Sequence, residues 1–218
     1  MPGYVFKIQL SETNIWRQIV VPQDISFHNL HKTIQFSMGW ENRHLYTFKP
    51  LESNIVFLET KAECDEYEYM QRQRINYMMQ SGKPMKEQTL SAYRVSRTTK
   101  IDKYLKDYSR YLYCYDMGDN WEHIITFESA LDDYPYPYPM IIAGEGQCPP
   151  EDCGGVPGYE YMCEVLQNPQ HAEYASYREW LGESYFEQCE FNIAQTNYAM
   201  SKVLTLKRKR KVKVYEIV

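Results

Sequence analysis

The chain has 218 residues, of which 44% are apolar and 15% aromatic, so it can bury a sizeable core and is not globally disordered. No run of about eighteen apolar residues occurs, and the N-terminus lacks the features of a secretory signal, so we expect no membrane association. The six cysteines occur in a chain too large to need disulfide bonds, and we therefore expect a cytoplasmic protein with reduced thiols.

The net charge of −5 is unevenly distributed. Residues 116–190 hold sixteen Asp or Glu and one basic residue, Arg178, whereas 207–213 carry six Lys or Arg. An acidic surface repels phosphate backbones and favours divalent cations or a basic protein partner. Residues 61–110 carry eleven Lys or Arg. This segment and the 207–213 tail leave nucleic acid open as a second partner.

The first fifty residues predict a strand, a second strand, a helix and a third strand. Apolar and polar residues alternate over 4–10, and 15–21 is typical of a strand as well. Ser26 is a helix N-cap, and Gly39 ends that helix. A third strand is predicted over 44–50. This β-β-α-β order is typical of a β-grasp-like start. The apolar residues of the helix follow at helical spacing: Phe27, Leu30, Ile34 and Met38.

The remainder of the chain predicts further strands and helices. Strands over 111–116 and 121–127 are joined by a turn, and the Pro-rich segment 132–140 is an extended connector. We expect an α+β fold with a mixed, mainly antiparallel sheet and helices packed on it. It forms a single domain over 1–206, and a basic tail follows over 207–218. The predicted helices are 63–80, within an insertion near 60–105, and 157–167, 171–181 and 193–205.

The stretch YDMGDNWEH (115–123) holds two Asp, a Glu and a His around one Gly. In a hairpin, Asp116 and Asp119 flank the turn, while Trp121 and His123 share one strand face. Two interpretations are open. The aspartates form the turn beside a buried core histidine, or the carboxylates and the imidazole bind a metal or act as acid and base.

A second candidate site is the Gly- and Pro-rich loop 144–159. Its Glu151, Asp152 and Cys153 lie between residues that fix the backbone, as in many binding loops. The loop lacks the Gly-Lys-Ser/Thr of a phosphate-binding loop. The acidic surroundings of this segment disfavour a reactive thiolate, and with it nucleophilic cysteine catalysis.

Cysteines offer a weaker metal hypothesis. Cys148 and Cys153 have the spacing C-x4-C, which is not that of a standard zinc pair, and no matching second pair exists. The remaining zinc ligands would come from a set of three residues: Cys114, His123 and Cys163.

Taken in order, several motifs resemble the plasmid pRiA4b ORF-3-like family. The resemblance covers residues 4–195 and is interrupted by 60–105, which is longer than expected. The matching pieces are IWR (15–17), LH (30–31), MGW (38–40), HL (44–45) with Phe48, YDMGDNWEH (115–123), AGEGQCPPEDCGG (143–155), GYE (158–160) and the segment from Trp180 to Phe191.

The resemblance implies an α+β domain with a mixed sheet. Such proteins occur in bacteria and archaea, often on plasmids or beside mobile elements, and no molecular activity is established for them. Two positions depart from the family. Cys153 replaces an apolar residue, which weakens a Cys148–Cys153 zinc pair, and Asn192 replaces an aspartate, which removes a carboxylate. The family-like polar positions are His31, His44, Asp116, Asp119, His123, Cys148, Glu151 and Asp152.

Two functional hypotheses follow. In the first, the chain is a binding or accessory module of mobile-element or nucleic-acid-related processes, and its acidic face docks a basic partner. In the second, it is a metal-dependent hydrolase or nuclease in which Mg²⁺ or Mn²⁺ generates a nucleophilic water. The second hypothesis requires at least three candidate side chains to converge on one point.

The candidate site cluster contains residues of both motifs: Asp116, Asp119, Trp121, His123, Cys148, Glu151 and Asp152. The secondary candidates are His31 and His44. The weak metal-ligand candidates are Asp116, Asp119, His123, Glu151 and Asp152.

Overall fold

The computed structural model describes residues 2–81, 90–183, 185 and 191–204. At its centre is an eight-stranded sheet. The strands are β1 (Gly3–Leu10), β2 (Trp16–Pro22), β3 (Tyr46–Pro50), β4 (Ile55–Leu58), β5 (Ala92–Val95), β6 (Arg110–Tyr115), β7 (Trp121–Leu131) and β8 (Met140–Glu145). They lie in the order β5-β4-β3-β6-β7-β1-β2-β8. Neighbouring strands are antiparallel except β4 and β5, which are parallel. The sheet is therefore mixed and mainly antiparallel, as predicted.

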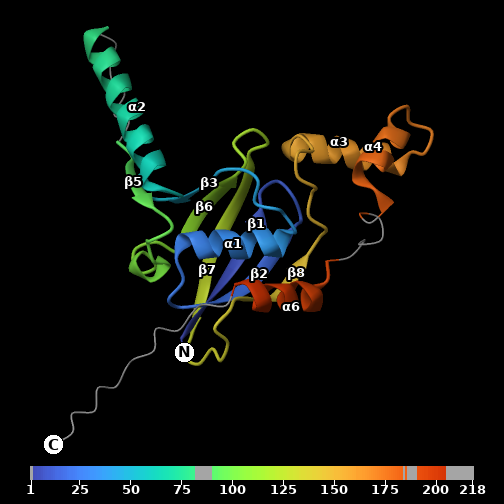
Figure 1. Ribbon diagram of the computed structural model, residues 1–218, viewed down its shortest axis with the longest axis horizontal. Helices are drawn as coiled ribbons and strands as arrows, with labels where there is room; N and C mark the ends of the chain where they lie inside the picture. The colour runs from blue at the N-terminus through green and yellow to red at the C-terminus, as the bar shows by residue number, and fades with distance from the viewer. Residues whose placement is uncertain (1, 82–89, 184, 186–190, 205–218) are drawn as a thin grey trace, which may run out of the picture.

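Helices cover one face of this sheet and extend from both of its sides. They are α1 (Phe27–Met38), α2 (Lys61–Gln80), α3 (Gly155–Gln167), α4 (Tyr174–Leu181) and α6 (Ile193–Val203). Figure 1 shows α1 crossing the sheet with α6 beside it, while α2 projects near β5 and the α3–α4 pair extends on the opposite side. None of the helices in the described part of the chain has the length and apolar composition that crossing a bilayer requires.

The core lies between α1 and the central strands. Residues of β1 alternate, so that Phe6 and Ile8 are buried under α1 in the main cluster, and Val5 points to the other face. On that other face, Val5 packs with Val20 and Tyr134 in a small second cluster. The Pro-rich connector that carries Tyr134 thus covers part of the sheet.

Helix α1 begins and ends where the sequence predicts. The Ser26 side chain accepts a hydrogen bond from the Asn29 backbone N–H at 3.2 Å and caps the helix. At the other end Gly39 has a φ of 83° and donates its N–H to the Gln35 carbonyl at 2.9 Å. The end of α1 at Gly39 determines where residues 40–45 begin, and these residues contribute to the site described below.

The outer half of the sheet contains elements that the sequence did not predict. The β-β-α-β order is confirmed, but β6 and β7 lie between β3 and β1. Strands β4 and β5 have four residues each and are joined by α2. Helix α2 begins two residues before its predicted start, because Thr60 and Glu63 form a capping box.

The C-terminal part agrees with the sequence at the level of elements. Strand β8 was not predicted, and it pairs with β2 at the edge of the sheet. The helix predicted over 171–181 begins at Tyr174, and the helix predicted over 193–205 ends at Val203. The basic tail 207–218 lies outside the described residues, so the interpretation of that segment stays a prediction.

Candidate metal centre and adjoining cleft

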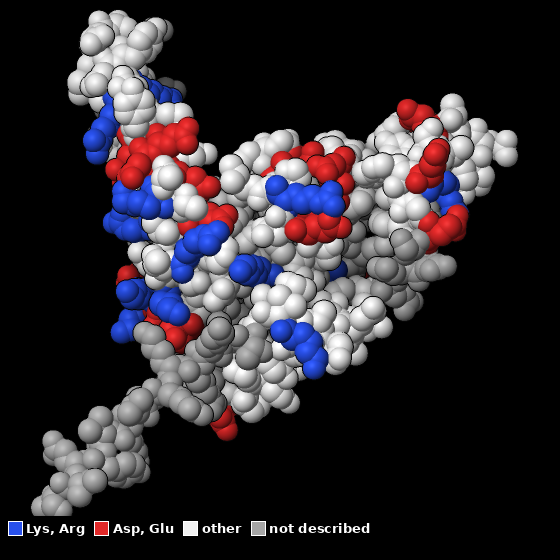
Figure 2. All heavy atoms as spheres, in the orientation of Figure 1, with Lys and Arg blue, Asp and Glu red and all other residues white. Residues whose placement is uncertain are grey.

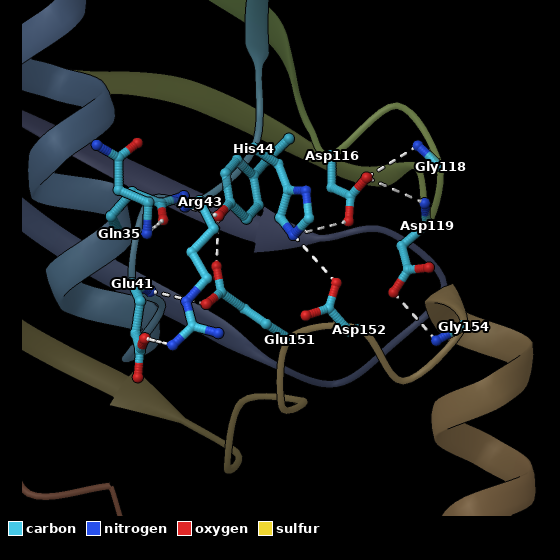
Figure 3. Close-up of polar contacts among 12 residues, drawn as sticks. Gln35, Glu41, Arg43, His44, Asp116, Gly118, Asp119, Glu151, Asp152 and Gly154 are labelled. Carbon is cyan, nitrogen blue, oxygen red and sulfur yellow. Dashed lines mark hydrogen bonds and ion pairs between the residues drawn. The ribbon is translucent and has the colours of Figure 1, made fainter.

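The hairpin turn 116–120 and the loop 148–155 lie side by side (Figure 3). The Asp119 carboxylate accepts a hydrogen bond from the Gly154 backbone N–H at 3.0 Å. A Cβ atom at Gly155 would lie 2.4 Å from the Asp119 carbonyl oxygen, so the two backbones touch at this point. The two motifs that sequence analysis singled out separately therefore form one surface.

The turn holds Asp116 in a fixed orientation. Its carbonyl oxygen accepts a hydrogen bond from Asn120 at 2.6 Å, which closes the turn between β6 and β7. Its side-chain Oδ1 accepts from the Gly118 N–H at 2.9 Å and lies 3.4 Å from the Asp119 nitrogen. With Oδ1 engaged by the backbone, Oδ2 points toward His44, which lies just before β3.

Three side chains converge beside this turn. His44 Nε2 lies 3.5 Å from Asp116 Oδ2 and 3.1 Å from Asp152 Oδ1. One ligand atom from each residue lies within 4.8 Å of the other two. Within the described part of the chain, no other group of three His, Cys, Asp or Glu meets this criterion. Figure 3 shows the imidazole of His44 pointing between the two carboxylates.

The His44 ring nitrogen makes no hydrogen bond despite these short distances. Nε2 is inaccessible to solvent and has no hydrogen-bond partner among the described residues. Because both oxygens are close enough, the mismatch is one of direction: neither lies along the ring N–H. Ligands of one metal ion at about 2.1 Å are themselves separated by about 3.0–3.4 Å. The 3.1 Å separation from Asp152 falls within this range and the 3.5 Å separation from Asp116 lies just outside it, and both are also ion-pair distances.

The backbone is strained at two of the three residues. Asp116 and Asp152 have φ values of 56° and 60°, in the left-handed region that side chains other than glycine occupy infrequently. Such conformations cost free energy and persist where the surrounding structure imposes them, often at binding sites. Asp and Asn tolerate this region better than other residues, which agrees with their presence here.

Glu151 and Tyr115 connect the loop to β6 and to the segment before β3. The Tyr115 hydroxyl donates a hydrogen bond to Glu151 and accepts one from the Arg43 backbone N–H at 3.0 Å. The second Glu151 oxygen accepts from the Glu41 backbone N–H at 3.1 Å. Burial, and then the hydrogen bond to Glu151, raise the pKa of Tyr115. The tyrosine therefore stays protonated and can keep donating to the carboxylate.

Other sequence candidates lie in the core and do not reach this group. Trp121 and His123 are fully buried, and His123 Nδ1 lies 3.1 Å from the Trp121 carbonyl oxygen. Burial lowers the pKa of His123 to about 3. His31 is also buried, its ring stacked on Tyr46 at 3.6 Å, and burial lowers its pKa to about 3. Both histidines thus act as neutral core residues.

The cysteines do not form a metal site in the described residues. Cys148 packs against the core, and burial raises the pKa of its thiol. Burial also raises the pKa of Cys153 to about 12. Five cysteines are free, and none belongs to a group with metal-ligand spacing. The zinc hypothesis based on Cys148 and Cys153 therefore receives no support, and Cys189 lies outside the described residues.

A cleft of about 1000 Å³ opens next to the three converging residues. Its walls come from the end of α1 and residues 39–43, from the loop 147–152, from the end of α4 and from α6. Asp152 lines the cleft and also belongs to the converging group, and its side chain is 57% exposed. A molecule in the cleft would therefore contact the group from its solvent side.

Comparison with known proteins covers most of the chain. The profile of the plasmid pRiA4b ORF-3-like protein family matches residues 2–195. The chain belongs to this family. A pRiA4b ORF-3-like relative is the uncharacterized protein y4hQ of Sinorhizobium fredii (strain NBRC 101917 / NGR234). It is 32% identical over 193 residues, which are 87% of this chain and 84% of the relative.

A solved structure is similar in fold. It is a protein of unknown function, MM3350, from Methanosarcina mazei Go1, and it has 28% sequence identity and a TM-score of 0.68. The similarity covers 89% of this chain and 97% of the other. The family membership expected from the motifs is confirmed. Neither relative carries a described activity, so the chemistry of this pRiA4b ORF-3-like protein has to be argued from its geometry.

Sequence reasoning included the three converging residues but ranked them differently. Asp116 and Asp152 were primary candidates and His44 a secondary one, since nothing in its local sequence marks it. The bridging role of Tyr115 was missed, although the residue opens the motif. A tyrosine at the end of a strand is ordinarily interpreted as a residue that packs on the sheet. Only the position of the loop 148–155 shows that Tyr115 also bonds to Glu151.

Proposed function

We propose that this chain binds a divalent cation through His44, Asp116 and Asp152 and acts as a metal-dependent hydrolase. The observation that carries the proposal is the convergence of these three side chains around a buried His44 nitrogen without a hydrogen-bond partner. Catalytic metal sites commonly have three protein ligands and leave further positions to water and substrate. The exposed side of Asp152 and the adjoining cleft leave that room here.

The ligand set restricts the identity of the ion. Two carboxylates and one imidazole suit Mn²⁺ or Zn²⁺, because imidazole favours zinc and its neighbours while carboxylates favour harder ions. Mg²⁺ is bound mostly through oxygen atoms and water, so it fits this set less well. We therefore expect Mn²⁺ and Zn²⁺ to bind more tightly than Mg²⁺.

Calorimetric titration of the full chain with Mn²⁺, Zn²⁺ and Mg²⁺ tests the binding step. Asp152→Asn keeps the shape of the exposed side chain and removes one charged ligand, so we expect its affinity to fall about tenfold or more. Asp132→Asn is the matched control, because Asp132 is exposed, lies on the Pro-rich connector and does not belong to the converging group. Equal affinity in Asp152→Asn and the unchanged chain would refute the site.

Hydrolysis is a separate step and needs a separate measurement. With the metal bound, activated phosphodiester, phosphomonoester and carboxylic ester probes should be cleaved faster than in buffer containing the same ion. The activity should disappear in Asp152→Asn and remain in Asp132→Asn. Tight binding without any cleavage would overturn the hydrolase and leave a metal-binding module, and absence of both would overturn the whole proposal.

A second function is favoured by the surface of α3 and α4. Over residues 155–183 the single basic residue is Arg178, and all five glutamates are exposed. Figure 2 shows red, acidic side chains on this projecting part of the molecule. Trp180 of α4, which also lines the cleft, is 49% exposed. The glutamates are Glu160, Glu164, Glu173, Glu179 and Glu183.

Acidic groups around an exposed indole suit a Lys- or Arg-rich protein segment through charge attraction and cation–π contact. The family name refers to a plasmid reading frame, which supports an accessory role in mobile-element biology. Binding of a Lys/Arg-rich peptide can be followed by Trp180 fluorescence at increasing salt concentrations. Glu160→Lys with Glu164→Lys should weaken binding, and undiminished binding in this variant would exclude docking at this surface.

A further inference from the structure

Helix α2 is an arm that the other described residues cover on one flank and leave uncovered on the other. Among its 20 residues only Cys64 is buried. The covered flank contacts the β5 edge, where Gln71 exchanges hydrogen bonds of 3.0 and 3.2 Å with the Ser91 backbone and the Tyr67 ring lies 5.6 Å from that of Tyr93. Figure 1 shows the helix projecting from the sheet.

The uncovered flank carries an ordered row of side chains. Glu66, Met70 and Arg74 follow one another at intervals of four residues, so they lie in one line along the helix surface, and all three are exposed. Met70 is 48% exposed, and Tyr69 beside it is 62% exposed. Along the helix, the row therefore consists of an acidic, an apolar and a basic side chain.

This row is complementary to itself. Within one helix Glu66 and Arg74 are about 12 Å apart along the axis, too far for an ion pair. In a second copy packed antiparallel about a two-fold axis at Met70, Glu66 of each copy faces Arg74 of the other. The two Met70 side chains meet between these pairs. Interfaces of two-fold dimers use the same patch on both copies, which requires this kind of complementarity.

We propose that the α2 arm is a self-association surface, on which two copies of this chain pair antiparallel through Glu66, Met70 and Arg74. Aromatic and long apolar side chains offer on the order of 200 Å² each, so a two-helix contact buries on the order of 1000 Å² in total. Interfaces of this size are weak and transient. The dimer is accordingly concentration-dependent, with a dissociation constant in the micromolar to millimolar range.

Nucleic acid fits this flank less well than a second copy does. The first half of α2 carries four carboxylates, Glu63, Asp65, Glu66 and Glu68, which repel phosphate groups. Figure 2 shows charges of both signs along the arm. A helix surface that carries charges of both signs favours a partner surface with the same mixture of charges.

Sedimentation velocity of the full chain from micromolar to millimolar concentration tests the proposal. Glu66→Arg places two like-charge contacts in the dimer, and Arg74→Glu does the same with opposite sign. We expect each to raise the dimer dissociation constant about tenfold or more. The double variant Glu66→Arg/Arg74→Glu restores both pairs and should return to within about threefold of the unchanged chain.

Asp65→Arg is the matched control, since it makes the same charge change at an exposed position outside the Glu66, Met70 and Arg74 row, where Asp65 pairs with Lys61. It should leave dimerisation unchanged, and circular dichroism should show the same helix content in all variants. A monomer at every concentration would overturn the proposal. So would a double variant as weak as the single ones, or binding of an oligonucleotide by a chain that never self-associates.

Discussion

Gly155 has a φ of 69°, and a Cβ atom there would lie 2.4 Å from the Asp119 carbonyl oxygen. Two demands therefore meet at one residue: a left-handed backbone and contact with a neighbouring main chain. Gly39 at the end of α1 meets the first demand alone, because its φ is 83° and nothing lies within 4 Å of the Cβ position. Comparison of Gly39 with Gly155 therefore separates the cost of a left-handed backbone from the cost of a steric clash with a neighbouring main chain.

Gly155→Ala should be markedly more destabilising than Gly39→Ala. The left-handed conformation costs alanine about 1–2 kcal/mol at either position, and displacing the Asp119 backbone adds about 1–3 kcal/mol at position 155 alone. Urea unfolding of both variants gives the comparison. If the two substitutions lowered the free energy of unfolding equally, the turn and the loop would not be in backbone contact.

Strand β6 contributes to the site through the side chain of Tyr115 at its end. The hydroxyl connects Arg43, which precedes His44, with Glu151, which precedes Asp152. Two of the three ligands of the proposed cation, His44 and Asp152, thus follow a residue that Tyr115 holds, and the third, Asp116, follows Tyr115 itself. The alternation of β6 places Tyr111, Tyr113 and Tyr115 on the same buried face, so one strand supplies both the core and the bridge.

Tyr115→Phe should keep the fold and weaken the site. Loss of the hydroxyl removes the partner of the Arg43 N–H and of one Glu151 oxygen, which costs about 1–3 kcal/mol of unfolding free energy. We also expect the Mn²⁺ affinity to fall several-fold. Tyr111→Phe is the control, because its hydroxyl donates to the Tyr108 carbonyl away from the site. Equal Mn²⁺ affinities in both variants would show that Tyr115 does not position the ligands.

Elements with local signals could be predicted from the sequence, and those defined by distant neighbours could not. The N-cap Ser26 and the terminal Gly39 fix α1 within a few residues, and the prediction was right at both ends. Strands β4 and β5 have four residues each, and they are strands because β4 pairs with β3 and β5 pairs with β4. His44 was a weak candidate for the same reason, since its neighbours Asp116 and Asp152 come from other segments.

The stability of the whole molecule should decrease as the pH falls below about 6.5. Burial lowers the pKa of His31 and His123 to about 3, from 6.5 in an unfolded chain. Above about 6.5 both rings are neutral in both states, and protonation does not favour either state. Between about 6.5 and 3 the unfolded chain binds protons that the folded chain does not, so unfolding is favoured.

Each of these histidines contributes about 1.4 kcal/mol of unfolding free energy per pH unit within that window. Urea unfolding at several pH values gives the slope for the full chain. His123→Gln should reduce the slope by that amount even if the variant is less stable at every pH. An unchanged slope in His123→Gln would mean that this ring is protonated in the folded protein.

The sequence predicted the fold class and the order of the elements along the chain. It did not predict the order in which the strands lie in the sheet. Periodicity predicted β6 and β7 as a hairpin, and the structure agrees. The same periodicity contains no information on whether that hairpin inserts between β3 and β1 or lies at an edge. Long-range pairing of this kind depends on the packing of whole faces, such as the burial of Phe6 and Tyr113 under α1.

His44, Asp116 and Asp152 reach their common point from segments separated by several strands and helices. During synthesis, the ribosome must therefore release the chain beyond residue 152 before these groups can act as a chelate. A nascent or denatured chain contains the same donors but cannot hold them together, and so it cannot retain an ion. Uptake of the proposed cation would therefore follow the folding that brings these three segments together, and each complete unfolding of the protein would release the ion to the surroundings.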